Sequence, residues 1–424
     1  MKSVNEHSLP GPDDISHIVL PNGITVLART NFNSPSVVIG GYLPCGSLFD
    51  PDEKLGLADF TASSVMRGSE KREFQKIFDD LESVGANLSF SAGGHTAGFT
   101  GRCLSEDLPV LFDLLADALR CPVFPMEQVE RLRAQFLTSL AIRAQDTAEM
   151  ASLTFNQIVF KGHPYARPED GWPETIQAIT RDDLVDFHHI HYGPRGLVIA
   201  IVGAVEPKVI AGQVAKVLGD WTNPSQPELP SLPVLKPLKN PVTRKVKIPG
   251  KSQTDLVIGT SGPRRKDPEY LPSSLGNSVL GQFGLAGRIG EVVREKSGLA
   301  YYASSSLSAG IGPGAWDVSA GVNPKNVQKA CDLICEEIKR FVDKGVTAEE
   351  LADSQSNFVG RLPLSLESNA GVVNALLNIE RFDLGLDYYR RYPGLVRTVT
   401  PEDVLATACK YLHPDRLAVS IAGS

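Results

Sequence analysis

Arg294 and Tyr301 are the residues whose types and spacing point most directly to chemistry on a carbonyl group. They lie seven positions apart in the stretch 285–306, which reads L-A-G-R-I-G-E-V-V-R-E-K-S-G-L-A-Y-Y-A-S-S-S. A guanidinium and a phenol are both hydrogen-bond donors, so together they could hold a carbonyl oxygen or its developing oxyanion without transferring a proton. Residue types alone favour a simpler interpretation, an exposed arginine at a helix end and a tyrosine packed in a strand.

A helix and the strand after it must position this pair. The helix is predicted to end at Gly298, with Lys296 in its last turn, where a cation interacts favourably with the helix dipole. A strand then begins at Leu299. Tyr302 follows Tyr301 along that strand and is expected to point to the opposite face, which makes it the weaker candidate as a donor.

A second stretch, Leu55–Arg72, reads L-G-L-A-D-F-T-A-S-S-V-M-R-G-S-E-K-R and predicts a helix that closes at Gly68 as a C-cap. It resembles the G-L-A-H-F-x-E-H-x-x-F-x-G-[ST] helix of the insulinase/pitrilysin-type peptidases, whose inverted zinc motif is H-x-x-E-H. In that motif two histidines on one helical face bind zinc, and the glutamate deprotonates the attacking water. Here the three positions hold Asp59, Ala62 and Ser63.

The family's third zinc ligand is a glutamate about 76 residues past the second histidine. From Ser63 that count reaches Ser139, inside the helical run 127–144. A catalytic zinc needs three good ligands, and these four positions offer only the carboxylate of Asp59. The resemblance therefore implies a non-zinc member of the family, with no metal or other cofactor in this chain. Asp59 is expected to be a solvated or N-terminal-turn carboxylate.

The stretch 285–306 closely resembles the family segment S-R-L-x-x-x-[LV]-R-E-x-x-G-L-[AS]-Y. Arg294 and Tyr301 then match the two residues that catalytic relatives use to bind the substrate, and the resemblance shifts the balance towards function. Small relatives pair as two chains, one supplying the zinc helix and the other the Arg/Tyr motif. The resemblance implies that this chain is the Arg/Tyr subunit of a heterodimeric metallopeptidase that takes polypeptides or short peptides, inactive without its zinc-bearing partner. The alternative is a catalytically silent scaffold or peptide-binding subunit.

Composition narrows the classes of function. The 424 residues are 42% hydrophobic and 21% charged, as in an ordinary soluble protein. A net charge of −7 argues against nucleic-acid binding or a polybasic membrane patch. No apolar run is long enough for a membrane span, and residues 1–14 contain no signal-peptide core. The sequence leaves the compartment open, with the bacterial periplasm or cytoplasm expected.

An internal repeat determines the predicted architecture. Residues 179–203 align without a gap on residues 399–423, at an offset of 220 throughout. Each copy reads as a Thr-capped helix, a turn marked by proline and an apolar strand. The chain is therefore predicted to be two tandem homologous α/β domains of the α+β class. The sheets are expected to be mostly antiparallel with helices packed on one face, and the resemblance implies that the domains face each other across a cavity.

The connector between the copies is rich in proline. Trp221–Thr243 contains prolines at 224, 227, 230, 233, 237 and 241 and has no helical period, which predicts an extended, semi-rigid segment. The predicted organisation is a domain with a degenerate zinc motif at 1–224, a linker at 225–241 and a domain with the Arg/Tyr motif at 242–424.

Three other groups of residues could suggest a metal or phosphate site, but their context favours a structural interpretation. The histidines at 188, 189 and 191 close a helix, where they suit its dipole, and no acidic cluster accompanies them. Cys331 and Cys335 have helical spacing but are expected to be buried as small apolar groups. The glycines at 281, 284 and 287 resemble helix-turn-helix glycines of the family and lack the strand–helix context of a phosphate-binding loop.

Overall fold

The computed structural model of the protein describes residues 9–282 and 287–424, so Gly284, residues 285–286 and most of the N-terminal stretch considered above lie outside the described residues. The described chain forms two compact units. The first unit contains the chain up to Leu140 together with Pro168–Ser231 and Leu362–Arg391. The second unit contains Ala141–Arg167, Leu232–Arg361 and Tyr392–Ser424.

The first unit is built on a six-stranded sheet with the order β1-β2-β6-β3-β5-β4. Every pair of neighbouring strands is antiparallel except β2 and β6, which are parallel. Strands β4 and β5 form a hairpin that turns at Gly93 and Gly94. The strands are β1 (Ser16–Val19), β2 (Thr25–Thr30), β3 (Ser36–Leu43), β4 (Asn87–Ala92), β5 (Ala97–Leu104) and β6 (Val198–Gly203).

The second unit is built on a five-stranded sheet with the order β7-β11-β8-β10-β9. Only β7 and β11 are parallel. This order repeats β2-β6-β3-β5-β4 of the first sheet, so the two sheets share one topology and the prediction of two homologous α/β domains is confirmed. The strands are β7 (Val242–Lys247), β8 (Thr254–Ser261), β9 (Ala300–Leu307), β10 (Ala315–Val322) and β11 (Ala418–Gly423).

The repeated helix begins in the same way in both copies. The hydroxyl of Thr180 accepts from the backbone N–H of Asp183, and the Asp183 carboxylate accepts from the Thr180 N–H at 2.8 Å. Thr400 and Asp403 form the same capping box at the start of the second copy. Such reciprocal caps satisfy N–H groups that a helix leaves unpaired at its start, which explains why the sequence predicts this helix well.

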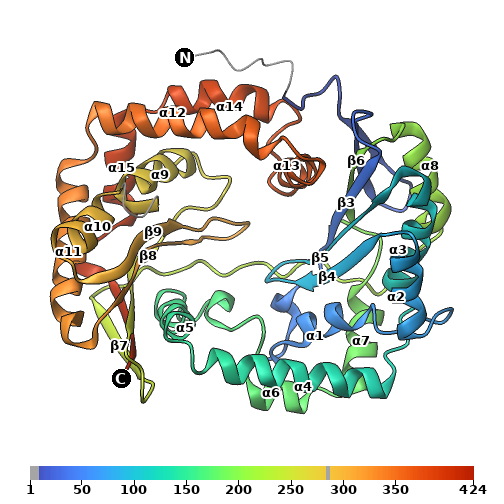
Figure 1. The fold of residues 1–424 in the computed structure, drawn as a ribbon, viewed down its shortest axis with the longest axis horizontal. Helices are drawn as coiled ribbons and strands as arrows, with labels where there is room; N and C mark the ends of the chain where they lie inside the picture. Colours follow the sequence, from blue (N-terminus) through green and yellow to red (C-terminus); the bar gives the residue numbers. More distant parts are fainter. Residues whose placement is uncertain (1–8, 283–286) are drawn as a thin grey trace. The chain divides into compact units, whose positions relative to one another are not determined.

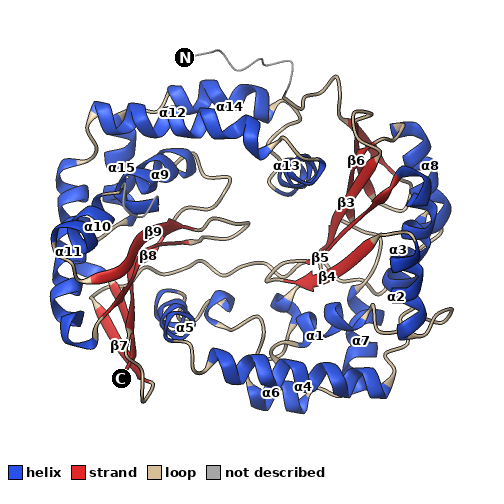
Figure 2. Cartoon of the chain, in the orientation of Figure 1, coloured by secondary structure: helices blue, strands red, loops and turns tan. Residues whose placement is uncertain are grey.

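Helices cover both faces of each sheet. In the first unit α3 and α8 lie on one face and α13 lies on the other (Figures 1 and 2). A Cβ at Gly40 of β3 would lie 2.7 Å from Val373 of α13, so glycine permits this close packing. The expected layer on one face is present, and α13 adds a second. The helices are α1 (Leu57–Ser64), α2 (Phe74–Ser83), α3 (Leu108–Arg120), α4 (Met126–Arg143), α5 (Thr147–Val159), α6 (Pro173–Ala178), α7 (Arg181–His191), α8 (Pro207–Leu218), α9 (Tyr270–Asn277), α10 (Arg288–Gly290), α11 (Val327–Lys344), α12 (Ala348–Ser365), α13 (Asn369–Arg381), α14 (Tyr388–Arg397) and α15 (Pro401–Tyr411).

The two sequence copies exchange one helix each. Helix α5 follows the first copy's α4 but packs on β8 and β11 of the second unit. Helix α13 follows the second copy's α12 but packs on β3 and β6 of the first unit. The predicted boundaries at 224 and 242 describe the repeat in the sequence, whereas the compact units are discontinuous along the chain.

The connector is extended, as predicted. Residues 222–241 contain neither helix nor strand. Leu235 and Leu238 pack against an apolar cluster that includes Val159 and Val257, so the connector lies along the second unit from Leu232 onwards. Proline restricts the backbone of this segment and reduces the entropy lost when it is ordered.

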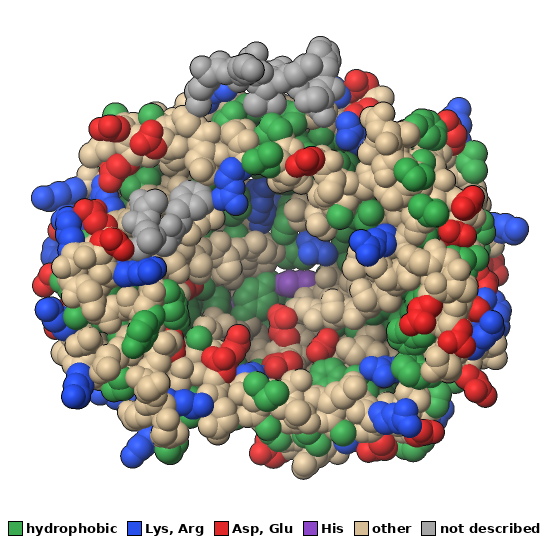
Figure 3. Space-filling model, viewed as in Figure 1, with side chains coloured by type: hydrophobic (Ala, Val, Ile, Leu, Met, Phe, Trp, Pro, Cys, Tyr) green, Lys and Arg blue, Asp and Glu red, His purple; other side chains and the backbone are tan. Residues whose placement is uncertain are grey.

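Surface charges do not gather on the face drawn in Figure 3, where Lys and Arg side chains alternate with Asp and Glu side chains. Within the described ranges, no helix is both long and apolar enough to cross a lipid bilayer.

Candidate functional site

Helix α1 carries the degenerate zinc motif and is firmly anchored at its start. The carboxylate of Asp50, 3% exposed, accepts from the backbone N–H groups of Gly56 and Ala58, each at 2.9 Å. Gly56 precedes the helix with φ of +95°, and a Cβ there would lie 2.7 Å from Ile176. A side chain at position 56 would be both strained and overpacked, so only glycine fits.

The predicted end of this helix is wrong. Helix α1 ends at Ser64, and Gly68 lies beyond it with φ of +145°. Gly68 forms an isolated bridge with Glu73 and accepts a hydrogen bond from the backbone N–H of Val123 at 3.1 Å. These non-local backbone contacts draw the chain out of the helix one turn earlier than the local pattern indicates.

Asp59 was expected to be either a solvated or an N-terminal-turn carboxylate. It lies in the first turn of α1, and its side chain is largely buried. Its Oδ1 accepts from the backbone N–H of Ala92 at the start of the β4–β5 turn, at 3.4 Å. The pKa of the Asp59 carboxyl is raised from its ordinary value of 3.8 to about 6, mainly by burial and also by the nearby Asp170 and Glu169, while the hydrogen bond from Ala92 opposes the rise. Asp59 is therefore a carboxylate held in a partly dry, acidic environment.

The other zinc-motif positions contribute little that could bind a metal. Ala62 is fully buried and has no ligand atom, Ser63 is half-buried, and Ser139 on α4 is exposed. Phe60 of α1 packs on Phe136 of α4 with ring centroids 5.1 Å apart, so the two predicted helices do lie together. One carboxylate and two neutral hydroxyls do not form a zinc site.

The residues present thus do not fit a zinc ion. Within residues 9–282 and 287–424, no group of three or more His, Cys, Asp or Glu side chains is arranged to hold a metal. Nε2 of His188 donates to the carbonyl of Leu119 at 3.0 Å, and the His191 ring packs against that of Phe187 with centroids 4.5 Å apart. Burial lowers the pKa of both imidazoles to about 4, so these histidines are structural and neutral.

The cysteines flagged by helical spacing are also accounted for by packing. Cys331 is 9% exposed on α11 and Cys335 is half-buried. Burial raises the pKa of both thiols, and that of Cys331 reaches about 12. A thiol that resists ionisation is a poor metal ligand and a poor nucleophile.

Arg294 and Tyr301 lie on the two elements predicted for them. Arg294 belongs to the wide-turn helix η8 (Glu291–Lys296), and Tyr301 belongs to β9. The chain turns between them at Gly298, whose φ is +60°. Both side chains are exposed, that of Tyr301 to 65%, and neither has a hydrogen-bond or ion-pair partner among the described residues. Both donors are consequently available to a ligand.

Tyr301 occupies a bulge in β9. Tyr302 pairs with Gly321 and Ala300 pairs with Val322, so Tyr301 is an extra residue with no partner on β10. A bulge twists the strand and redirects the side chain at that position. The sequence could not reveal this feature, because strict alternation along a strand was the only guide to where Tyr301 points.

Tyr302 fixes the strand beside the bulge. Its hydroxyl donates to Oδ1 of Asp255 on β8 at 2.6 Å, and Gln253 donates to the same carboxylate at 3.0 Å. The hydroxyl of Thr147 on α5 donates to the other carboxylate oxygen. Asp255 is 1% exposed and bears these three neutral donors. Sequence reasoning set Tyr302 aside as the weaker donor to substrate, but it missed this network, which joins residues 147, 253, 255 and 302.

Two family models match the chain, and both belong to one peptidase family. Residues 25–168 match the model described as Insulinase (Peptidase family M16), and residues 178–358 match the one described as Peptidase M16 inactive domain. An uncharacterized zinc protease of Streptomyces coelicolor is 25% identical over 407 residues, covering 94% of this chain and 87% of that protein. A probable mitochondrial-processing peptidase subunit beta of Arabidopsis thaliana is 26% identical over 212 residues, covering 50% of this chain and 40% of that protein.

Solved structures agree with the sequence matches. The crystal structure of a peptidase M16 inactive domain from Pseudomonas fluorescens superposes with a TM-score of 0.89 at 25% identity, covering 97% of this chain and 98% of that one. A protease from Helicobacter pylori shares the fold, with a TM-score of 0.88 at 18% identity and coverage of 98% and 100%. The two family models match consecutive parts of the chain, and the sheet topology is repeated in the two units. This chain therefore belongs to the insulinase (M16) family of peptidases.

Proposed function

We propose that this chain is the non-zinc subunit of a two-chain metallopeptidase. Its role is to bind the scissile carbonyl of a peptide through Arg294 and Tyr301, while a paralogous partner supplies the metal centre. The observation that carries the proposal is the contrast between two sites. The Arg/Tyr pair is intact and exposed without a partner among the described residues, whereas the zinc positions hold Asp59, Ala62, Ser63 and Ser139.

The chemistry of the pair supports this role. A protonated guanidinium and a neutral phenol both donate hydrogen bonds, and neither needs to exchange a proton to stabilise negative charge on an oxygen. An exposed tyrosine in a strand bulge next to an anchored Tyr302 is held by the backbone rather than by its own packing. Such a side chain can reorient towards a bound peptide at small cost.

The test is peptide cleavage by this chain reconstituted with a zinc-bearing paralogue. Tyr301→Phe removes only the hydroxyl and should lower kcat by on the order of 100- to 1,000-fold, the usual effect of losing one oxyanion donor. Arg294→Lys should have a kcat little higher than that of Arg294→Ala, because lysine keeps the positive charge but lacks the planar guanidinium that can donate two parallel hydrogen bonds. If both groups hold one oxygen, the double mutant should lose less activation free energy than the sum of the losses in the two single mutants.

A matched control comes from the same helical segment. Lys296 is 67% exposed and pairs with Glu291 at 2.7 Å, so Lys296→Ala removes a cation two positions from Arg294 without touching the proposed donors. Assembly is measured separately by size-exclusion chromatography. If Tyr301→Phe and Arg294→Ala assemble and cleave at the wild-type rate, the pair is structural and the chain is instead a scaffold or peptide-binding subunit.

A further inference from the structure

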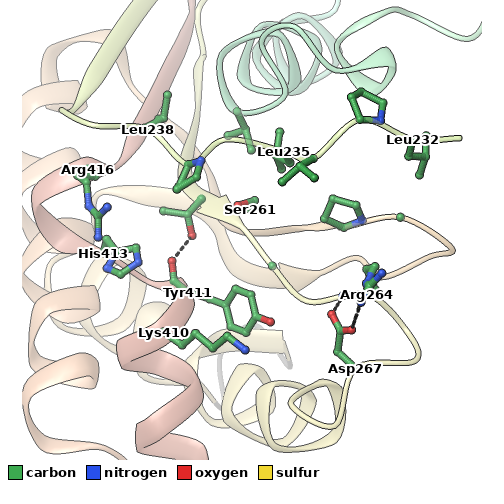
Figure 4. Close-up of a pocket in the computed structure, with 18 of the residues that line it drawn as sticks. Leu232, Leu235, Leu238, Ser261, Arg264, Asp267, Lys410, Tyr411, His413 and Arg416 are labelled. Carbon is green, nitrogen blue, oxygen red and sulfur yellow. Dashed lines mark hydrogen bonds and ion pairs between the residues drawn. The ribbon is translucent and has the colours of Figure 1, made fainter.

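The second unit contains a cavity of about 440 Å³ that is unrelated to the Arg/Tyr pair. One wall is the proline-rich connector at Leu232, Leu235 and Leu238, and the other walls include Ile311 and the end of α15 (Figure 4). This volume lies within the range of about 300–1,000 Å³ that holds small ligands in proteins. Most of the lining is apolar, so a ligand must carry an apolar body.

The walls of this cavity are held in place by specific contacts. The hydroxyl of Thr260 donates to the carbonyl of Tyr411 at 2.8 Å, which ties β8 to the end of α15. The backbone N–H of Gly312 donates to the hydroxyl of Tyr165 at 3.1 Å, which fixes the loop that carries Ile311. The connector is stiffened by Pro233 and Pro237. The cavity is therefore a formed feature of the unit.

The charges around the cavity are unevenly neutralised. Arg264 donates to Asp267 through two nitrogens, at 3.1 and 2.9 Å, and Lys410 is paired with Glu269. Arg416 differs, because its Nε is buried without a hydrogen-bond partner in the described structure and the nearest carboxylate, on the 80% exposed Asp415, is 3.8 Å away.

His413 lies beside this arginine at the same end of the cavity (Figure 4). Burial lowers the pKa of the His413 imidazole, and the Arg416 charge lowers it further. A guanidinium that has only a long ion pair to an exposed carboxylate, next to a neutral imidazole, presents one positive charge and additional hydrogen-bonding capacity, which suits a monoanion better than a dianion.

We propose that this cavity binds an amphipathic monocarboxylate, with its carboxylate on Arg416 and its apolar chain against Leu232, Leu235 and Ile311. Two sources share this chemistry, a free fatty acid and the C-terminus of a peptide that ends in an apolar residue. The inference does not rest on the proposed peptidase role, since it involves neither Arg294 nor Tyr301.

Isothermal titration calorimetry on the full chain tests the proposal with decanoate for the first source and N-acetyl-Leu-Leu for the second. Decanol and N-acetyl-Leu-Leu amide lack the carboxylate and should bind about 10- to 100-fold more weakly, the usual worth of one hydrogen bond to a charged group. Arg416→Gln should weaken the binding carboxylate by the same factor. Arg397→Gln, which removes the same charge from an exposed position on α14, should not change it.

Each outcome decides a point. Binding of decanoate alone identifies a fatty-acid site, and binding of the peptide alone identifies a peptide C-terminus site. If neither carboxylate binds the wild-type chain at millimolar concentration, or if each binds no better than its uncharged analogue, the proposal is overturned. That comparison uses only wild-type protein, so it stands even if Arg416→Gln does not fold.

Discussion

Replacing Asp59 by asparagine should stabilise the protein at neutral pH. The pKa of this carboxyl is raised from 3.8 to about 6 by burial first, with contributions from Asp170 and Glu169. A raised carboxyl pKa means that the folded state binds the proton more readily than the unfolded state. Its contribution to stability is therefore fully present below pH 3.8 and is lost as the pH rises through 6.

The size of the effect follows from the shift. About two pKa units correspond to at most about 3 kcal/mol of folding free energy above pH 7. Asparagine keeps an oxygen that can accept from the N–H of Ala92 but carries no charge, so Asp59→Asn should gain about 2–3 kcal/mol at pH 8 and only about 0.5 kcal/mol at pH 4.

Urea unfolding followed by tryptophan fluorescence between pH 4 and 8 measures this difference. Asp186→Asn on the exposed side of α7 is the matched control, since it makes the same chemical change at the surface. A difference curve between mutant and wild type cancels the many other carboxyls that titrate in both proteins. If Asp59→Asn is no more stable than wild type at pH 8, or if its advantage persists unchanged at pH 4, then Asp59 is solvated and the reasoning about its burial is wrong.

Three further outcomes are expected. Tyr302→Phe leaves Asp255 with one donor fewer and should lower the free energy of unfolding by about 1.5–3 kcal/mol in the same urea assay, whereas a loss below 0.5 kcal/mol would mean that the hydrogen bond is not made. Gly56→Ala should cost at least about 1–2 kcal/mol because φ is +95° there, and an unchanged thermal midpoint would contradict this. The purified chain should hold no stoichiometric zinc by elemental analysis, and a folded variant restored to the zinc motif should gain zinc. The four changes are Asp59→His, Ala62→Glu, Ser63→His and Ser139→Glu.

Features set by neighbouring residues were predictable from the sequence. The capping boxes at Thr180 and Thr400 need only a hydroxyl and a carboxylate three residues apart, and they recur in both copies. The helix-to-strand turn at Gly298 and the extended connector follow equally from local backbone preferences. These features locate the Arg/Tyr segment and the repeat without knowledge of the tertiary structure.

Features set by distant residues were not predictable in this way. Asp59 was expected to be solvated, yet its environment is made by Ala92, Glu169 and Asp170, which are far from it in the sequence. The bulge at Tyr301 depends on how β9 pairs with β10, a register that no residue of β9 specifies by itself. Both surprises concern the candidate sites, where side chains from several elements meet.

The exchange of α5 and α13 shows why a repeat and a folding unit need not coincide. The repeat records that two stretches of sequence correspond, at an offset of 220, and this remains true wherever their helices pack. Packing instead follows exposed apolar surface, and Gly40 leaves a flat patch on β3 that Val373 of α13 fills. In the second unit the hydroxyl of Thr147 on α5 donates to the buried Asp255. The exchanged helix therefore also supplies one of the hydrogen bonds that this buried carboxyl group needs. Each sheet is thus completed by a helix from the other copy, and a chain cut at the connector would leave both sheets with an uncovered face.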